Sequence, residues 1–347
     1  MGTNKQRDGG RARIEDVAAA ANVSVATVSR ALRGLPNVAE STRLRVAAIA
    51  ESMDYRPDPA ASRLAAGRSR TVTIVVPHLS TWYFSTVIAG AEAVCAEAGY
   101  ECLVVGVGNI DECNRLLDEP FHLERRTDGL VLVNIPATEA RAESLGRRGV
   151  MLSTVGTRTP GHPAVLIDDV RAGRMAANHL IGLGHRHIGL ISGQRDDPMN
   201  FAVPRMRREG FRSALDAAGL AFDETLVQSG NFGIDGGQEA MGSLLDRSDP
   251  PTAAFAMSDE MAFGALLALS ERGLRAGADV SLIGVDDHDV SRVVGLTTIR
   301  QRVAGQGAAA MRALLMRLAS ADAPAIVVDS PLELVVRSTT PRPLDTR

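Results

Sequence analysis

The first hydrophobic pattern along the chain predicts two short amphipathic helices joined by a polar turn. In residues 14–21 the apolar positions recur at the spacing of one helical face, and they are Ile14, Val17, Ala18 and Ala21. Ser24 follows the polar turn and is a good N-cap residue for a second helix over residues 25–33. The inward positions of that helix are Val28, Ala31 and Leu32. Its outward side chains are Ser24, Thr27, Ser29, Arg30 and Arg33.

This outer face is small, polar and cationic, which suits the edge of a DNA major groove. Two ordinary surface helices would show the same periodicity, so the distribution of charge is the deciding observation. Residues 1–70 carry 12 Lys and Arg against 7 Asp and Glu, a net charge of +5, whereas the rest of the chain carries 26 against 34, a net charge of −8. A near-neutral chain thus combines a basic head with an acidic body, which indicates a nucleic-acid-binding module.

A third amphipathic helix is predicted over residues 41–54, with Ser41 as its N-cap. Its inward positions are expected to be Leu44, Ile49 and either Ala48 or Val46. This helix would complete a three-helix head with a small core of its own. Pro57 and Pro59 then end it, because proline cannot continue a helix. The Ala-rich segment 60–67 has room for a helix of about two turns, which is too short to be stable alone.

From Thr71 onward the pattern changes to short apolar strands that alternate with amphipathic helices. The predicted strands are 72–76, 102–106, 129–133, 187–191, 253–257 and 280–285. The predicted helices cover roughly 84–98, 137–148, 172–183, 206–218, 235–246, 259–272 and 306–319. Near-continuous apolar strands between helices indicate parallel sheets covered on both faces. About eleven strands favour two such sheets over one, with a ligand cleft between two lobes at the carboxyl ends of the strands.

Other features narrow the class of protein. No apolar run is long enough to span a bilayer and no secretory signal is present, so a soluble cytoplasmic protein is expected. Three cysteines without metal-type spacing indicate reduced structural thiols, and they are Cys95, Cys102 and Cys113. A metal site is one interpretation of His179, His185 and His187. These residues lie where a predicted helix ends at a glycine and a strand begins, which favours a structural role for them. No phosphate-binding loop and no paired nucleophile and base stand out, so no enzyme, cofactor or metal is expected.

Several ordered motifs point to one family. The head contains the pattern D-V-A-x-x-A-x-V-S-x-x-T-V-S-R-x-L over residues 16–32. The body contains TDGLVLV (127–133), HLIGLGHRHIGLISG (179–193), Arg207 followed by Gly210-Phe211, AMSD (256–259), GVDDHD (284–289), LTTIRQ (296–301) and LVVRST (334–339). On these motifs the chain resembles the lactose/galactose repressor (LacI–GalR) family of bacterial transcriptional regulators from Ile14 to about Arg342.

The resemblance implies an all-α, three-helix helix-turn-helix head and an α/β body of two doubly wound parallel-sheet lobes like type I periplasmic binding proteins. It implies a DNA-binding domain over residues 1–57, a hinge helix and linker over 58–70, and an effector-binding and dimerisation domain over 71–347. The expected function is that of a ligand-responsive regulator, a repressor that binds a pseudo-palindromic operator as a homodimer. A small molecule in the cleft, expected to be a sugar or sugar derivative, would control its affinity for DNA. No leucine-heptad tail like that of the family follows LVVRSTTPRP, so no tetramer through such a tail is expected.

The family resemblance also implies DNA contacts in the head. Val25 and Ala26 match base-reading positions, and Arg30 lies one turn further on, where it could pair with a guanine edge or a phosphate. Contacts that position the DNA backbone are implied for Ser24, Thr27, Ser29, Thr42 and Tyr55. Asn37 matches a further contact, and Leu64 matches the hinge leucine that unstacks a base step in the minor groove. The alternative for each polar position is that the side chain is a helix cap or an ordinary surface group and does not contact DNA. Asp58 stands where the family usually has Asn.

For the effector, Arg207 and Asp286 match positions that grip ligand oxygens, since a guanidinium donates and a carboxylate accepts. Ser258 occupies a position that is often Asn, and Asp259 either touches ligand or caps the next helix. The loop containing Trp82 and Phe84 corresponds to a first-lobe ligand loop, where Trp82 either stacks on a sugar or covers the lobe edge. The alternative function is a sugar-binding protein of periplasmic type, which would have no use for residues 14–64. An α/β enzyme would need a catalytic constellation, and none is found.

Overall fold

The computed structural model describes residues 12–55, 69–119, 126–194, 199 and 201–341. The chain divides into two compact units, Met1–Ser69 and Arg70–Arg347, which we call the head and the body. Within the described residues, no helix combines the length and the apolar character that crossing a membrane requires.

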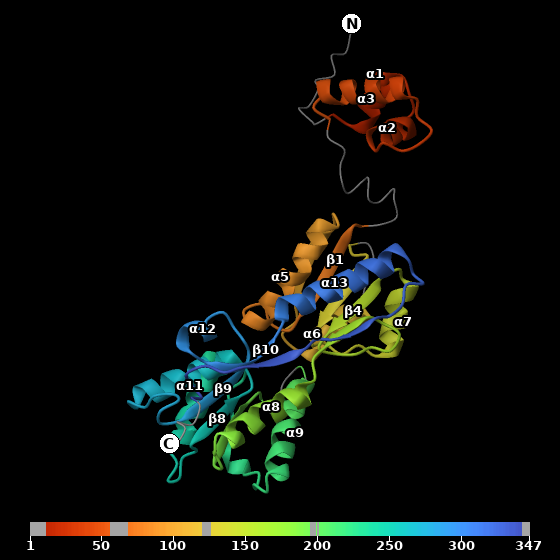
Figure 1. The fold of residues 1–347 in the computed structure, drawn as a ribbon. Coiled ribbons are helices and arrows are strands. Elements are labelled where there is room, and N and C mark those ends of the chain that lie inside the picture. The colour runs from red at the N-terminus through yellow and green to blue at the C-terminus, as the bar shows by residue number, and fades with distance from the viewer. Residues whose placement is uncertain (1–11, 56–68, 120–125, 195–198, 200, 342–347) are drawn as a thin grey trace. The chain divides into compact units, whose positions relative to one another are not determined.

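The head consists of three helices around a small core (Figure 1): α1 (Ile14–Ala21), α2 (Val25–Leu32) and α3 (Glu40–Ser52). The side chain of Ser24 caps α2 by accepting a hydrogen bond of 3.1 Å from the backbone N–H of Thr27. The core is formed by Val17, Ala18, Ala21, Val28, Ala31, Val46 and Ala50.

The predicted third helix was wrong in its start and in the inward position of Leu44, whereas Val46, one of the two alternatives, is buried and Ile49 packs against the core. It begins at Glu40 with Ala39 as the N-cap, so Ser41 lies inside the first turn. Leu44 is 64% exposed, and Val46 and Ala50 are the fully buried positions. The reason is the helical period, because two residues along a helix correspond to about 200° of rotation, which places Leu44 on the side opposite Val46.

The body contains two six-stranded sheets, each covered by helices, which confirms the two-lobed α/β fold. The first lobe has the strand order β11-β5-β4-β3-β1-β2, and all of its pairings are parallel. Its elements are β1 (Thr71–Val76), α5 (Trp82–Glu97), β2 (Glu101–Gly106), α6 (Ile110–Asp118), β3 (Gly129–Val133), α7 (Glu139–Arg147), β4 (Met151–Val155), β5 (Ala164–Leu166), α13 (Val303–Ala319) and β11 (Val327–Asp329).

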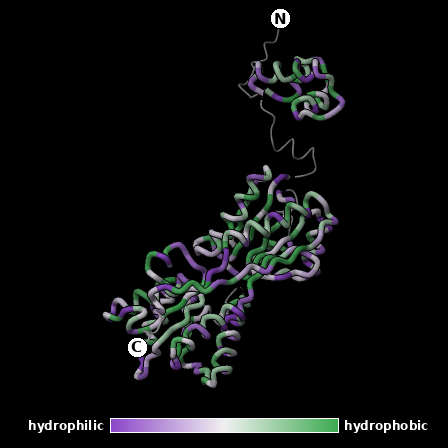
Figure 2. Tube along the Cα trace, viewed as in Figure 1, coloured by the Kyte–Doolittle hydropathy of each residue, from purple (hydrophilic) through white to green (hydrophobic). Residues whose placement is uncertain are grey.

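The second lobe has the order β12-β10-β9-β8-β6-β7, in which only the pairing of β12 with β10 is antiparallel within the described residues. Its elements are α8 (Asp169–Gly182), β6 (Ile188–Ser192), α9 (Ala202–Ala217), a 3₁₀ helix (Glu224–Leu226), β7 (Val227–Ser229), α10 (Ile234–Leu245), β8 (Ala253–Ala256), α11 (Asp259–Glu271), β9 (Ser281–Asp286), α12 (Ser291–Val294), β10 (Thr297–Gln301) and β12 (Leu332–Val335). All six predicted strands are present, and Figure 2 shows their hydrophobic residues gathered along both sheets.

The chain passes between the two lobes three times in its described part. It leaves the first lobe after β5, returns from β10 into α13, and leaves again between β11 and β12. Helix α13 packs against α5 and the first sheet, although nearly the whole second lobe separates these two helices in sequence (Figure 1). Each lobe is therefore completed by a segment that follows the other lobe in the sequence.

Helices α8 and α9 of the second lobe touch backbone to backbone. A Cβ atom on Gly173 would lie 1.9 Å from the carbonyl oxygen of Arg207, and one on Gly210 would lie 1.8 Å from the carbonyl oxygen of Val170. No side chain other than hydrogen fits at these two crossing points. The close crossing holds the backbone of Arg207 against α8, which also contributes Asp169.

Candidate functional site

The outer face of α2 is the candidate nucleic-acid interface. Val25 is 41% exposed, and Ala26 and Arg30 are also exposed. Among the residues that the structure describes, the Arg30 guanidinium has no carboxylate partner, so it is available to an external acceptor. The hydroxyls of Ser24 and Thr27 lie 2.8 Å apart and form a hydrogen-bonded pair at the start of the helix.

The other predicted DNA contacts occupy different settings. Ser29 and Thr42 are half-buried, and Asn37 is exposed with a left-handed φ of 69° between α2 and α3. Tyr55 packs against the head core, which gives it a structural role whether or not it also reaches DNA. Leu64 and Asp58 lie outside the described residues.

The body contains a cavity of about 430 Å³ at the junction of its two lobes. Its lining comes largely from the carboxyl ends of the parallel strands and from the loops that follow them, as predicted for this fold. The polar side chains of the lining are His78, Ser80, Thr81, Tyr83, Asn134, Asp169, Gln194, Arg207, Asn231, Ser258, Glu260, Asp286, Gln301 and Gln306. Phe84, Phe201 and Phe232 supply apolar surface. A cavity with converging polar groups and aromatic faces has the character of a small-molecule site.

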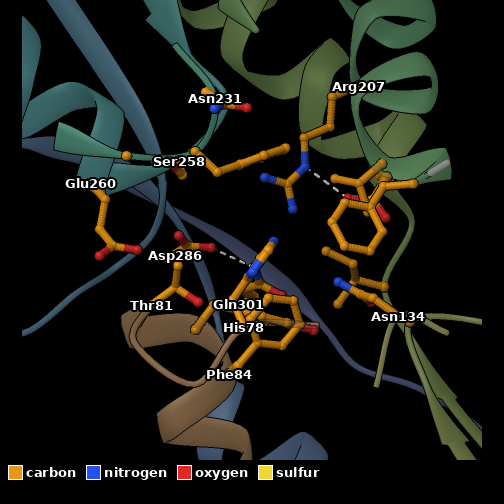
Figure 3. Close-up of a pocket in the computed structure, with 18 of the residues that line it drawn as sticks. His78, Thr81, Phe84, Asn134, Arg207, Asn231, Ser258, Glu260, Asp286 and Gln301 are labelled. Carbon is orange, nitrogen blue, oxygen red and sulfur yellow. Dashed lines mark hydrogen bonds and ion pairs between the residues drawn. The ribbon is translucent and has the colours of Figure 1, made fainter. Parts of the chain in front are cut away.

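Arg207 occupies one wall of this cavity (Figure 3) and is only 4% exposed. Its Nε donates a hydrogen bond of 2.8 Å to a carboxylate oxygen of Asp169, and its Nη1 donates to the backbone carbonyl of Met257. Burial alone would lower the pKa of Arg207, but the carboxylates of Asp169 and Asp286 outweigh burial and raise it. The guanidinium therefore stays charged, and its remaining N–H groups are available to a ligand.

Asp286 ends β9 and begins a hydrogen-bonded chain of side chains that reaches the first lobe. Gln301 donates a hydrogen bond of 2.6 Å to Asp286, and Gln306 donates one of 2.9 Å to Gln301. The hydroxyl of Tyr83 lies 3.5 Å from the amide oxygen of Gln306. Asp286 also has a φ of +129°, which costs about 1–3 kcal/mol in a residue other than glycine. Such strain is retained where the surrounding structure needs the side chain in one place.

Burial raises the pKa of Asp286 to about 7, although Arg207 and the hydrogen bond from Gln301 oppose this shift. Between pH 3.8 and 7 the folded protein holds a proton that the unfolded chain has released, so this carboxyl destabilises the body as pH rises through that window. We expect Asp286→Asn to raise the free energy of unfolding at pH 8 by up to about 4 kcal/mol and to change it little at pH 4. Urea unfolding followed by the fluorescence of Trp82, the one tryptophan, measures this difference.

Asp289→Asn is the matched control, because Asp289 lies three residues further on and is exposed. It should leave the free energy of unfolding unchanged at both pH values. An Asp286→Asn variant that gains no stability between pH 4 and pH 8 would show that Asp286 is ionised in the folded protein at acidic pH.

The predicted effector residues divide into two groups. Phe84, Arg207, Ser258 and Asp286 line the cavity, but Trp82 and Asp259 do not. The Trp82 ring stacks at 4.6 Å on the ring of His288, so it joins the two lobes beside the cavity. Asp259 is fully buried and accepts hydrogen bonds from the backbone of His288 and from the hydroxyls of Ser291 and Thr298. Its carboxylate is thus occupied in holding the loop after β9.

Sequence reasoning missed several lining residues. Asp169 is the first residue of α8 and lies shortly after β5, a strand of three residues that was not predicted, so its place at the carboxyl end of a strand was not recognised. Gln301 lies in the motif LTTIRQ, but nothing marked its amide as a cavity group. Glu260 stands in the first turn of α11, where an acidic residue is usual for its interaction with the helix dipole.

The histidines considered as metal ligands are used separately. His179 contacts the hydroxyl of Thr340 at 2.7 Å, and His185 contacts Thr252 and Ser281. His187 lies 3.3 Å from a carboxylate oxygen of Asp249. No group of three metal-binding side chains occurs among the described residues. His185, which follows Gly184 just after α8, therefore ties this end of the helix to Ser281 at the start of β9.

Comparison with known proteins agrees with this arrangement. Residues 13–58 match the family "Bacterial regulatory proteins, lacI family", and residues 177–340 match the "Periplasmic binding protein-like domain". The chain is 33% identical over 308 residues to the HTH-type transcriptional repressor CytR of Escherichia coli (strain K12), covering 88% of this chain and 89% of CytR. The match over the head disfavours the alternative of a sugar-binding protein without DNA function.

Two solved structures extend the comparison. The lac repressor dimer bound to operator and the anti-inducer ONPF superposes with a TM-score of 0.81 at 25% identity, covering 95% of this chain and 99% of that one. A complex of the transcriptional regulator CelR with cellobiose superposes with a TM-score of 0.68 at 30% identity, covering 95% and 100%. These relatives are transcriptional regulators, in agreement with the expectation from the sequence. This chain belongs to the lacI family of bacterial regulatory proteins and is a DNA-binding transcriptional regulator.

Proposed function

We propose that this protein is a cytoplasmic repressor that binds a pseudo-palindromic operator as a homodimer. A carbohydrate bound in the body cavity controls its affinity for the operator. The observation that supports a carbohydrate as the ligand is the set of buried polar groups around the cavity. Arg207 offers N–H donors and Asp286 offers a carboxylate, a combination that pairs with the hydroxyls of a polyol. Phe84 and Phe232 supply faces on which a sugar ring can stack. The CelR structure, which is similar to this chain, contains cellobiose.

Within the head we assign the DNA-binding domain to residues 1–57, followed by a hinge helix and linker over 58–70 and an effector-binding and dimerisation domain over 71–347. In the head, Val25 and Ala26 can give only apolar contacts to bases, such as to a thymine methyl group. Arg30 is then the main group for direct reading of a base, and the supporting contacts are assigned to Ser24, Thr27, Ser29, Asn37, Thr42, Tyr55 and Leu64. Much of the remaining specificity is expected to come from DNA shape.

The cavity is lined from both lobes, which gives a ligand a means of acting on the body. Phe84 and Tyr83 come from the first lobe, whereas Arg207, Ser258 and Asp286 come from the second. A ligand that touches both sets favours one angle between the lobes over another. A difference in DNA affinity between the two angles is then a coupling free energy between cavity and operator.

The test is fluorescence anisotropy with labelled DNA from upstream of the protein's own gene, with and without candidate sugars. We expect binding that falls steeply as salt rises, because phosphate contacts release counterions, and a sugar that shifts the midpoint. A salt-independent isotherm would contradict DNA binding through the basic head. Steep salt dependence with no response to any sugar would contradict only the proposed effector class.

A further inference from the structure

The charges around the cavity are unequal. Three acidic side chains line it, and they are Asp169, Glu260 and Asp286. Arg207 is the one Lys or Arg among the described lining residues. Because Arg207 forms a buried ion pair with Asp169, these two charges largely cancel. Neither Glu260 nor Asp286 forms an ion pair with Lys or Arg in the described structure, although the charge of Arg207 acts on Asp286.

The partners of these two carboxylates are neutral. Asp286 accepts a hydrogen bond from the amide of Gln301, and Glu260 accepts one from the backbone of Trp82. Glu260 and Asp286 lie on the same side of the cavity, across from Arg207 in Figure 3. They are close enough for the negative charge of Glu260 to raise the pKa of Asp286. Burial raises the pKa of Glu260, and burial with the charge of Glu260 raises that of Asp286. The surroundings of both carboxylates thus stabilise the negative charge less than water would.

A third polar group faces the same part of the cavity without a partner. The hydroxyl oxygen of Thr81 is buried, lines the cavity and has no hydrogen-bond partner in the described structure. Figure 3 shows Thr81 beside Asp286. Buried polar groups usually have a hydrogen-bond partner, and a ligand on this side of the cavity would supply the one that the Thr81 hydroxyl lacks.

We propose that the ligand of this cavity is an amine-bearing carbohydrate whose ammonium group lies between Glu260 and Asp286. This inference rests on the proposed carbohydrate function and narrows its ligand class. The ammonium supplies three N–H donors, enough for both carboxylates and for the Thr81 oxygen. Hydroxyl groups on the other side of the sugar accept from Arg207. A hexuronate or sugar phosphate whose anionic group occupied the same place would instead meet two carboxylates that have no ion-pair partner, and would be repelled.

A structural role for Glu260 is the competing explanation, because an acidic residue in the first turn stabilises a helix through its dipole. Glu260→Gln separates the two roles, since it keeps the size of the side chain and the acceptor for Trp82 but removes the charge. Glu271→Gln, at the other end of α11, is the matched control, because Glu271 is exposed and outside the cavity.

The experiment is isothermal titration of the full chain at pH 8 with three matched sets of sugars. The amines are glucosamine, galactosamine and mannosamine, the neutral parents are glucose, galactose and mannose, and the acids are glucuronate and galacturonate. We expect one amine to bind at least about tenfold more tightly than its neutral parent, a preference that falls to about twofold or less in Glu260→Gln and persists in Glu271→Gln.

The outcomes separate this inference from the proposed function. A neutral sugar or a hexuronate that binds as tightly as the best amine overturns the amine inference and leaves the carbohydrate function standing. An amine preference that survives intact in Glu260→Gln also overturns the placement of the ammonium. If no sugar of the three sets binds, the inference fails together with the carbohydrate assignment.

Discussion

Arg207→Ala should lower the free energy of unfolding of the body by about 3–5 kcal/mol, because it leaves the buried carboxylate of Asp169 without its partner. The carbonyl of Met257 loses its donor in the same step. The cavity also loses its one described guanidinium, so the response of DNA binding to ligand should disappear while operator affinity without ligand stays near the wild-type value. Urea unfolding and operator anisotropy on the same preparations measure both effects.

Two variants test whether the loss comes from the unpaired carboxylate. Arg208→Ala, at the next position of α9, removes a guanidinium whose ion pair with Glu224 is at the surface, and should cost at most about 1 kcal/mol. Adding Asp169→Asn to Arg207→Ala should recover part of the lost stability, since the remaining side chain is neutral. Equal losses in Arg207→Ala and in the double variant would mean that packing, not charge, explains the effect.

Arg30→Ala should weaken operator binding by about 2–6 kcal/mol, roughly 30-fold to 10⁴-fold, if each of two heads loses one bidentate contact to a base. The fold of the head should be unaffected, because Arg30 is exposed and α2 is held by Val28 and Ala31. Anisotropy titrations at constant salt measure the change, and circular dichroism confirms that the helices are retained.

Arg30→Lys distinguishes base reading from charge alone, since lysine keeps the charge but lacks the planar fork. We expect it to lose most of the discrimination between operator and random DNA. Arg147→Ala, on the exposed side of α7 in the body, is the charge control and should bind operator normally. If Arg30→Lys keeps full discrimination, Arg30 contacts a phosphate and not a base.

The sequence predicted the fold well because its strongest signals are local. The six long apolar strands and the two head helices with clear periodicity are all present. Among the missed strands, β5 and β7 have three residues each, too few for a pattern to emerge. Shortness does not explain the omission of β4 and β10, which have five residues each and contain Ser, Thr, Arg or Gln among their apolar residues. Leu44 of α3 was wrongly assigned to the core, because an exposed leucine has the same hydrophobicity as a buried one.

The cavity was less predictable, because it depends on which neighbouring side chain the tertiary structure turns inward. Ser258, Asp259 and Glu260 are consecutive, yet Asp259 is buried in the loop hydrogen bonds while its two neighbours line the cavity. Nothing in the order of these residues distinguishes them. Trp82 was predicted as a ligand contact, but it does not line the cavity and contacts His288 of the other lobe instead.

The order of synthesis has a consequence for the first lobe, whose helix α13 lies far along the chain from its partner α5. The apolar face of α5, which includes Phe84, Val87 and Ala91, has to wait for about 200 further residues before α13 can cover it. At translation rates of about 5–20 residues per second, the wait is roughly 10–40 seconds. The nascent chain thus exposes this face to chaperones and to other nascent chains long after the head has emerged from the ribosome and has been able to fold.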